Sequence, residues 1–253
     1  MDAPPAFEEL VAEGASVPVE GWDFSWFEGR ATEERPPWGY LGLMGQRMAM
    51  ATAALDIQTG GAEVIAQIPH PPPRLAATES WPPNVEIARR NLAPLGGTVA
   101  AIADDADLPF PAGSFDLVTS RHPVYVRWDE VTRVLTPGGT FLSQMVGAGS
   151  VRELTDAMMG PQVPNQARSP RRAVDQAQAA GLTVLDLQTA QLEMRFHDIA
   201  AVIVFLRKVI WTVPGFTVDR YRPQLAELHQ RIRADGSFTA RSQRFLIEAR
   251  KPG

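Results

Sequence analysis

Two patterns of apolar and polar residues alternate through the middle of the chain. Short apolar runs, typical of buried strands, are separated by stretches with the spacing of an amphipathic helix. The short runs predict strands at 53–57, 75–79, 98–103, 115–119 and 140–146. The other stretches predict helices at 41–51, 62–68, 85–95 and 128–135. Strands that alternate with helices indicate a parallel sheet with helices on both faces.

Two of the predicted helices carry boundary signals. Asn84 precedes the helix at 85–95 and is expected to be its N-cap. Pro137-Gly138-Gly139 is expected to end the helix at 128–135, because a helix stops readily at Gly and Pro.

The pattern after Gly147 is less regular. It predicts helical segments up to Ala180, a long strand at 182–196 and helices at 198–209 and 220–233. A last strand is expected at 244–249, antiparallel to the strand before it. The first 40 residues are irregular and aromatic-rich, which suggests a lid over the core. We therefore expect an α/β fold with a Rossmann-like doubly wound sheet, mostly parallel with an antiparallel last strand, an N-terminal lid and a C-terminal helical insertion.

Composition narrows the range of functions. The 253 residues carry a formal charge of −5, which argues against electrostatic binding of nucleic acid by the chain as a whole. The segment from Ala201 onward nevertheless has ten basic and four acidic residues, so a basic face or an ordinary solvated helix surface would both fit. There is no cysteine and the four histidines are dispersed, so we expect no metal site.

Targeting signals are not evident. The acidic start MDAPPAFEEL does not have the pattern of a secretory signal, and the most apolar stretch, 199–206, is too short to cross a bilayer. We expect a cytoplasmic protein that does not bind membranes.

Chemistry-bearing residues follow the predicted strands. Asp56 ends the first strand and leads into a Gly-bearing turn at Gly60, while Glu79 ends the second strand. Such a turn lets backbone approach a ligand closely, and an acid on the next strand can accept both hydroxyls of a ribose. Asp104, just past the third strand, can accept a hydrogen bond from an exocyclic amine, and apolar neighbours can cover a base. Together they predict an adenosine-type site.

Four motifs, LDIQTGGAE, ATES, ADDADLPFPAGSFDLV and RVLTPGGTF, occur in this order. With them the chain resembles the class I S-adenosylmethionine-dependent methyltransferases, over about residues 55–147. The resemblance implies S-adenosylmethionine as cofactor, with S-adenosylhomocysteine as product. It implies cofactor-binding residues Asp56, Gln58 and Gly60 at the amino-acid end, Glu79 at the ribose, Asp104 at the adenine, and Ser120 with Arg121 beside the sulfonium. Ser80 and Asp105 are further expected cofactor-binding residues.

The resemblance also suggests how the chain is divided. We expect one domain over 1–253, with a lid and helix at 1–50, the cofactor-binding core at 51–147 and a C-terminal half at 148–253 that contributes a substrate-pocket insertion.

The sequence departs from the family pattern in its glycine motif. The three alternate positions after Asp56 read Gln58, Gly60 and Ala62, where the family has glycine. A glutamine there must turn away from the ligand, fill its space or bond to it. Retained cofactor binding and altered or lost cofactor use both remain open.

Candidate catalytic and substrate residues surround the same strand ends. His122 is the candidate general base, with a loop hydrogen bond as its alternative role. Arg121 is a candidate for binding an acidic group of the substrate, with a structural ion pair as its alternative. Five aromatic residues are candidates for the substrate pocket, although core packing would also explain them: Trp38, Tyr40, Trp211, Phe216 and Tyr221.

Three functions are compatible with these features. The first is methyl transfer to oxygen or nitrogen of a small organic molecule. The second is another step, such as a cyclisation or rearrangement, on a repurposed methyltransferase fold without the cofactor or with it as a structural element only. The third is RNA methylation through the basic C-terminal segment. The sequence does not disclose the oligomeric state.

Overall fold

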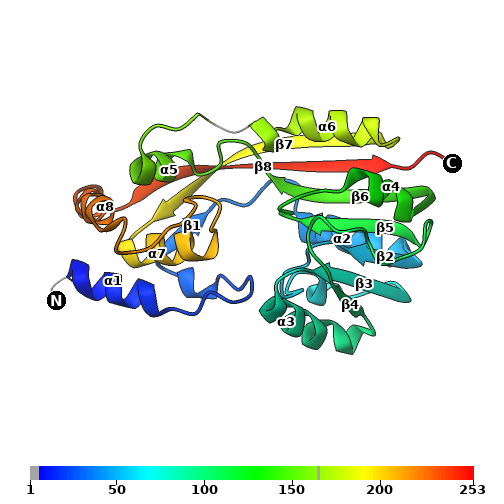
Figure 1. Ribbon diagram of the computed structural model, residues 1–253, viewed down its shortest axis with the longest axis horizontal. Coiled ribbons are helices and arrows are strands. Elements are labelled where there is room, and N and C mark those ends of the chain that lie inside the picture. The colour runs from blue at the N-terminus through cyan, green and yellow to red at the C-terminus, as the bar shows by residue number, and fades with distance from the viewer. Residues whose placement is uncertain (1–5, 164–165) are drawn as a thin grey trace. The chain divides into compact units, whose positions relative to one another are not determined.

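The computed structural model describes residues 6–163 and 166–253 (Figure 1). The first five residues of the expected lid and two residues of the expected helical stretch before Ala180 lie outside this part. The chain forms two compact units: Met1–Arg35, Gly149–Asn165 and Gln191–Gln243 make the first, and Pro36–Ala148, Gln166–Ala190 and Arg244–Gly253 make the second. The expectation of one domain with a lid stays a prediction.

The strands form one hydrogen-bonded sheet in the order β1-β7-β8-β6-β5-β2-β3-β4. Its parallel part consists of β2 (Ala53–Asp56), β3 (Arg74–Glu79), β4 (Thr98–Ala101), β5 (Phe115–Arg121) and β6 (Leu135–Val146). The last strand, β8 (Phe238–Arg250), pairs antiparallel with β6. This confirms the expected mostly parallel sheet with an antiparallel last strand.

Helices pack against both faces of the sheet in the second unit. They are α2 (Tyr40–Met50), α3 (Pro82–Leu92), α4 (Trp128–Val134) and α6 (Pro170–Ala179). Ala54 and Leu117 belong to the apolar cluster that contains α2 and α3 residues. Their chain neighbours Leu55 and Val118 belong to the cluster that contains α4 and α6 residues. Successive strand residues point to opposite faces, so each strand supplies both clusters, as a doubly wound sheet requires.

The first unit is mainly helical. Its helices are α1 (Phe7–Ser16), α5 (Arg152–Met159), α7 (Ile199–Lys208) and α8 (Arg222–Asp235). A short strand, β1 (Ala31–Glu33), pairs antiparallel with the end of β7 (Thr183–Phe196). Helix α7 is buried continuously over its first eight residues, and Asp198 caps it by accepting a hydrogen bond from Ala201 N at 2.8 Å. A helix that is apolar all round forms the centre of this unit.

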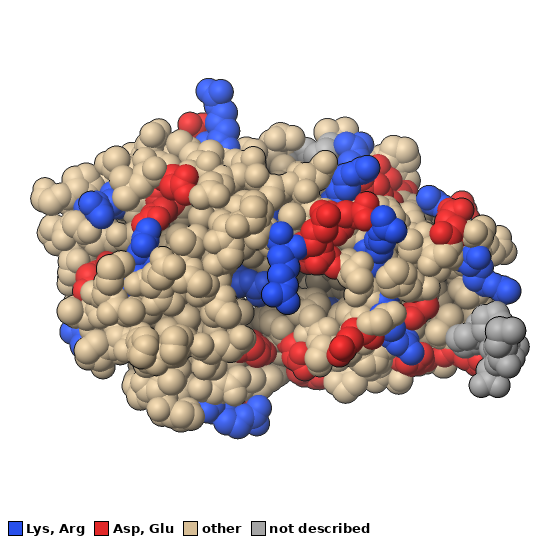
Figure 2. Space-filling view, turned by 180° about the vertical axis from the view of Figure 1, so that it is seen from behind, with Lys and Arg blue, Asp and Glu red and all other residues tan. Residues whose placement is uncertain are grey.

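The basic excess after Ala201 is partly neutralised within the first unit. Arg222 pairs with Glu8 at 2.7 Å, and Arg241 pairs with Glu153 at 3.2 Å. On the face shown in Figure 2, basic and acidic side chains are interspersed. No described helix is both long and apolar enough to span a membrane.

Three local expectations were wrong. Residues 62–68 contain only the 3₁₀ turn η2 (Ile65–Gln67), because Ala62 has a φ of 62°, which no helix can include, and Pro71 follows closely. Asn84 is not an N-cap, because α3 begins at Pro82 with Trp81 as its cap.

Pro137-Gly138-Gly139 lies within β6 instead of separating a helix from a strand. Gly138 N donates to Lys251 O, and Lys251 N donates to Gly139 O, both at 2.9 Å. These two bonds extend the pairing at the end of β8. The remaining 3₁₀ turns are η1 (Ser25–Phe27), η3 (Ala93–Leu95) and η4 (Gln166–Arg168).

We predict that Asp116→Ala destabilises the fold by about 2 kcal/mol at neutral pH. The Asp116 carboxylate accepts three hydrogen bonds at the start of β2, from Thr52 N at 2.8 Å, from Thr52 Oγ1 at 2.6 Å and from Ala53 N at 3.0 Å. Burial raises the pKa of Asp116, but these bonds outweigh it and lower the pKa below its ordinary 3.8. The stabilisation is therefore present above about pH 4 and is lost as the pH falls further. Urea unfolding from pH 3 to 7 measures it, with Asp175→Ala as the exposed control. An equal loss in both variants would contradict it.

Candidate functional site

The turn after β2 has an unusual backbone. Gln58, Gly60 and Ala62 have φ values of 54°, 65° and 62°, so three alternate residues are left-handed although only one is glycine. Thr59 N donates to Thr78 O at 2.9 Å, which attaches the turn to β3. A left-handed conformation costs a residue other than glycine about 1 kcal/mol or more, and such strain is concentrated at functional sites.

The Gln58 side chain joins this turn to the loop after β5. Its Nε2 donates to Tyr125 O at 2.6 Å, and its Oε1 accepts from Val124 N at 2.7 Å. We call these two hydrogen bonds the Gln58 bridge. It joins the turn after β2 to the loop after β5, where the family resemblance implies the amino-acid end of a cofactor.

The Glu79 carboxylate is held by the backbone at the end of β3. One oxygen accepts from Gly60 N at 2.8 Å and the other from Trp81 N at 3.0 Å. Burial raises the pKa of Glu79, although hydrogen bonds from Trp81, Gly60 and Ser80 oppose the rise. A carboxylate has about four acceptor sites, so these three backbone bonds leave room for one ligand hydroxyl.

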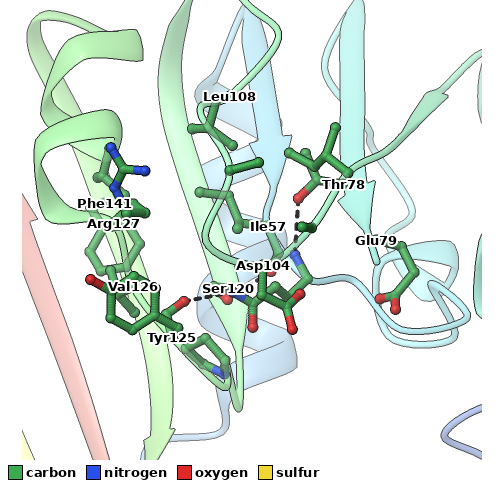
Figure 3. A pocket seen from close by; sticks show the side chains of 16 residues that line it. Ile57, Thr78, Glu79, Asp104, Leu108, Ser120, Tyr125, Val126, Arg127 and Phe141 are labelled. Atoms are coloured by element: carbon green, nitrogen blue, oxygen red, sulfur yellow. Dashed lines mark hydrogen bonds between the residues drawn. The ribbon is translucent and has the colours of Figure 1, made fainter. Parts of the chain in front are cut away.

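One pocket lies at the carboxyl ends of the parallel strands (Figure 3). We call it the strand-end pocket. Its lining includes four of the predicted cofactor residues, Gln58, Glu79, Asp104 and Ser120. The remaining lining residues are Ile57, Thr78, Ile102, Ala103, Ala106, Leu108, Pro123, Tyr125, Val126, Arg127, Val131 and Phe141.

Of the other predicted cofactor residues, Ser80 and Asp105 are exposed, while Asp56 and Gly60 are buried behind the lining. Asp105 O accepts from Arg127 at 2.7 Å, which ties the segment after β4 to the loop after β5. Ser120 Oγ donates to Ile57 O at 2.7 Å and so joins β5 to β2.

Sequence reasoning missed most of the apolar lining. Figure 3 shows Leu108, Val126 and Phe141 in the pocket wall, contributed by three separate segments. Tyr125, half exposed in the loop after β5, also lines the pocket. Apolar residues directly after strand ends were the signal that could have found Tyr125 and Val126.

Asp56 is buried directly behind the pocket. Its carboxylate accepts from Thr119 Oγ1 at 2.6 Å and from Thr59 Oγ1 at 2.7 Å. Burial raises its pKa to about 6, against the lowering effect of these hydroxyls and of Arg121. The carboxyl therefore joins β2, β5 and the strained turn, and none of its oxygens lines the pocket.

His122 is held in one tautomer by its neighbours. Trp38 Nε1 donates to Gln144 Oε1 at 2.7 Å, so the Gln144 amide nitrogen faces His122 Nε2, 2.9 Å away, and donates to it. The proton of the neutral ring is therefore on Nδ1. Burial, with Arg121, Arg244 and Arg168, lowers the pKa of His122 well below its ordinary value. The ring also sits on a left-handed residue with a φ of 58°.

The predicted substrate-pocket residues lie in both units. In the second unit Trp38 and Tyr40 are buried, and Tyr40 Oη donates to Ser120 O at 3.1 Å. Neither lines the strand-end pocket. In the first unit Phe216 and Tyr221 stack at 5.7 Å, and Trp211 packs on the same apolar cluster. A role for these five residues in binding substrate stays a prediction.

The part of the chain that the structure describes holds no group of three or more His, Asp or Glu side chains arranged to bind a metal ion.

Comparison with known proteins identifies the fold. Residues 55–143 match a family model described as a methyltransferase domain. YcgJ from Bacillus subtilis has a TM-score of 0.61 at 20% identity, covering 85% of this chain and 98% of that one. The chain has the class I methyltransferase fold. The resemblance inferred from the four sequence motifs is thereby confirmed.

Two further structures show the range of proteins with this fold. A proposed methyltransferase from Bacillus halodurans has a TM-score of 0.60 at 17% identity, covering 84% of this chain and 99% of that one. The [4+2]-cyclase SpnF has a TM-score of 0.53 at 17% identity, covering 97% of this chain and 91% of that one. No curated protein sequence matches the chain. At these identities the likeness shows the fold alone.

We predict that Asp56→Asn changes how stability depends on pH. The folded pKa of Asp56, about 6, lies above its ordinary 3.8, so the folded protein keeps a proton that the unfolded chain releases between about pH 4 and 6. Wild-type stability should therefore fall as the pH rises through this range.

The Asn variant lacks this decline, so its stability relative to wild type should increase from pH 4 to 6 and then stay level. Urea unfolding at several pH values measures both proteins, with the exposed Asp105→Asn as control. Parallel curves for Asp56→Asn and wild type would show that burial does not shift this carboxyl.

Proposed function

We propose that the chain is an S-adenosylmethionine-dependent methyltransferase that methylates oxygen or nitrogen of a small organic molecule. The supporting observation is that four residues which the sequence resemblance assigned to the cofactor line one pocket at the strand ends. Ligands of open parallel sheets bind at this edge. A cytoplasmic location is part of the same proposal.

The strand-end pocket suits an adenosine group. Ile102, Leu108 and Val126 can cover the two faces of a base, and the Asp104 carboxylate can accept from its exocyclic amine. Glu79 keeps acceptor capacity for a ribose hydroxyl while it stays bonded to the backbone. These residues would hold the nucleoside part of the cofactor.

The amino-acid part fits only when the Gln58 bridge opens. The bridge spans the ends of β2 and β5 through bonds of 2.6 and 2.7 Å to the β5 loop. Two neutral hydrogen bonds contribute about 1–3 kcal/mol, which binding can offset. Rotation of the Gln58 side chain would leave the turn itself attached to β3 through Thr59.

The chain's own residues would contribute mainly orientation. When bound, S-adenosylmethionine supplies a methyl group on a positively charged sulfur. Holding an acceptor in line with that methyl group accounts for much of the rate in such reactions. A general-base role for His122 would require its Nε2 to be released from Gln144, since that lone pair accepts the amide proton.

The Gln58 bridge also favours a second candidate, a repurposed fold that does not transfer methyl groups. A closed bridge at the amino-acid end would leave room for adenosine or another ligand but exclude the cofactor. The likeness to a cyclase supports this only at the level of the fold. RNA methylation has less support, because basic and acidic side chains are interspersed on the face in Figure 2.

Calorimetric titration with S-adenosylhomocysteine and with adenosine separates the two candidates. The proposal predicts micromolar binding of S-adenosylhomocysteine to wild type, about −8 kcal/mol. Gln58→Gly should bind it about tenfold more tightly, because no bridge has to open, while adenosine affinity stays unchanged. Ala62→Gly is the matched control, because it also replaces a left-handed residue by glycine but leaves the bridge intact.

Binding of S-adenosylhomocysteine to Gln58→Gly but not to wild type would contradict the methyltransferase proposal and favour the repurposed fold. Failure of both ligands to bind any variant would refute the assignment of the pocket itself.

A further inference from the structure

Basic residues gather at the carboxyl end of β6. On one side, β5 brings Arg121 into register with Gln144, and His122 N donates to Gln144 O at 2.7 Å. Paired residues of neighbouring strands project from the same face of a sheet. Arg121 and Gln144 therefore share a face, and Trp38 bonds to Gln144 from that face.

On the other side of β6, β8 brings Arg244 into register with Val146. Val146 is two residues from Gln144, so Arg244 projects from the same face as Gln144. Just beyond the strand, Ala148 N donates to Arg168 O at 3.1 Å. Three separate segments of the second unit thus bring their basic residues to the end of β6.

The charges of these three arginines affect one imidazole. Arg121, Arg244 and Arg168 all act on His122, where they add to the effect of burial and lower its pKa. Burial also lowers the pKa of Arg168, so its guanidinium is partly dehydrated. Like charges held together repel one another, which favours a bound anion among them.

The chemistry of the donors defines the ligand. A guanidinium presents a planar fork of N–H groups that matches the oxygens of a carboxylate or phosphate. The neutral His122 ring adds a donor of the same kind, because Gln144 occupies Nε2 and leaves the proton on Nδ1. Backbone strain at His122, with its φ of 58°, is typical of a residue positioned for a ligand.

We propose that Arg121, Arg168, Arg244 and the Nδ1–H group of His122 form a subsite for an anionic group, a carboxylate or phosphate, of the acceptor molecule. We call these four residues the basic cluster. Arg121 directly follows Ser120, which lines the strand-end pocket, so the cluster and the pocket share the carboxyl end of β5 but start from opposite faces of the sheet, and an acceptor anchored here would reach the pocket around that end. The assignment of this anionic group to a methyl acceptor rests on the proposed function. Binding of an anion by the basic cluster does not depend on the proposed function.

Inorganic phosphate is the probe, and the imidazole signals of ¹⁵N-histidine-labelled protein are the readout at constant ionic strength. We expect a saturable shift of the His122 signal and a rise in its pKa, because a bound phosphate offsets the nearby positive charge. Arg168→Gln and Arg244→Gln should each weaken phosphate binding at least tenfold. Arg121→Gln, an exposed position, serves as a third variant should either of these fail to fold.

Arg171→Gln is the matched control. It removes the same charge from a side chain that is 92% exposed on α6, and it should bind phosphate like wild type. No saturable shift in wild type, or equal weakening in the control, would overturn the subsite.

Titration with S-adenosylhomocysteine shows whether the basic cluster binds an anionic group of the acceptor or the carboxylate of the cofactor. The proposal expects the cluster variants to keep wild-type affinity for it. If they lose that affinity and phosphate competes with S-adenosylhomocysteine, the cluster binds the cofactor's own carboxylate and the acceptor assignment is wrong. Phosphate binding without any binding of S-adenosylhomocysteine would uphold the subsite while contradicting the proposed function.

Discussion

The left-handed turn after β2 is the constraint on which the rest of the site depends. Gln58, Gly60 and Ala62 have positive φ, so the chain turns tightly just after Asp56. In this turn Gly60 N donates to the Glu79 carboxylate, and the Gln58 amide bonds to the loop after β5. Two left-handed positions occupied by residues other than glycine are costly, so neighbouring contacts must maintain them.

Buried polar contacts provide this support. Asp56 bonds to a threonine of the turn and to Thr119 of β5, and the turn backbone bonds to Thr78 of β3. Each of these groups is satisfied by its neighbours, which makes the network rigid. These buried hydrogen bonds thus join the ends of the strands, while the two apolar clusters pack helices against the two faces of the sheet.

Much of the fold could be predicted from sequence because strand burial leaves a clear pattern. The run Ala53–Leu55 is apolar at every position, and β2 is buried on both faces, as in a central parallel strand. The prediction of a helix at 62–68 was wrong because Ala62 has a left-handed backbone, which the residue type alanine does not indicate. Asn84 failed as a cap because Pro82 can itself begin a helix.

The site was predicted as a set of strand-end residues but not as a set of contacts. Acids that end strands could be named, since parallel strands bring their carboxyl ends to one edge. Gln58 was recognised as unusual, yet its bonding to the loop after β5, 66 and 67 residues away, depends on tertiary structure. Arg168 and Arg244 were missed for the same reason, because only the pairing around β6 unites them with His122.

We propose that the strand-end pocket holds the nucleoside of the cofactor and that the Gln58 bridge opens for the cofactor's amino-acid part. A crystal structure with S-adenosylhomocysteine tests this most directly. We expect adenine against Asp104, ribose on Glu79, and a Gln58 side chain rotated away from Tyr125 O. Ligand density elsewhere, or the amino-acid part bound while the bridge to Tyr125 and Val124 stays closed, would contradict it.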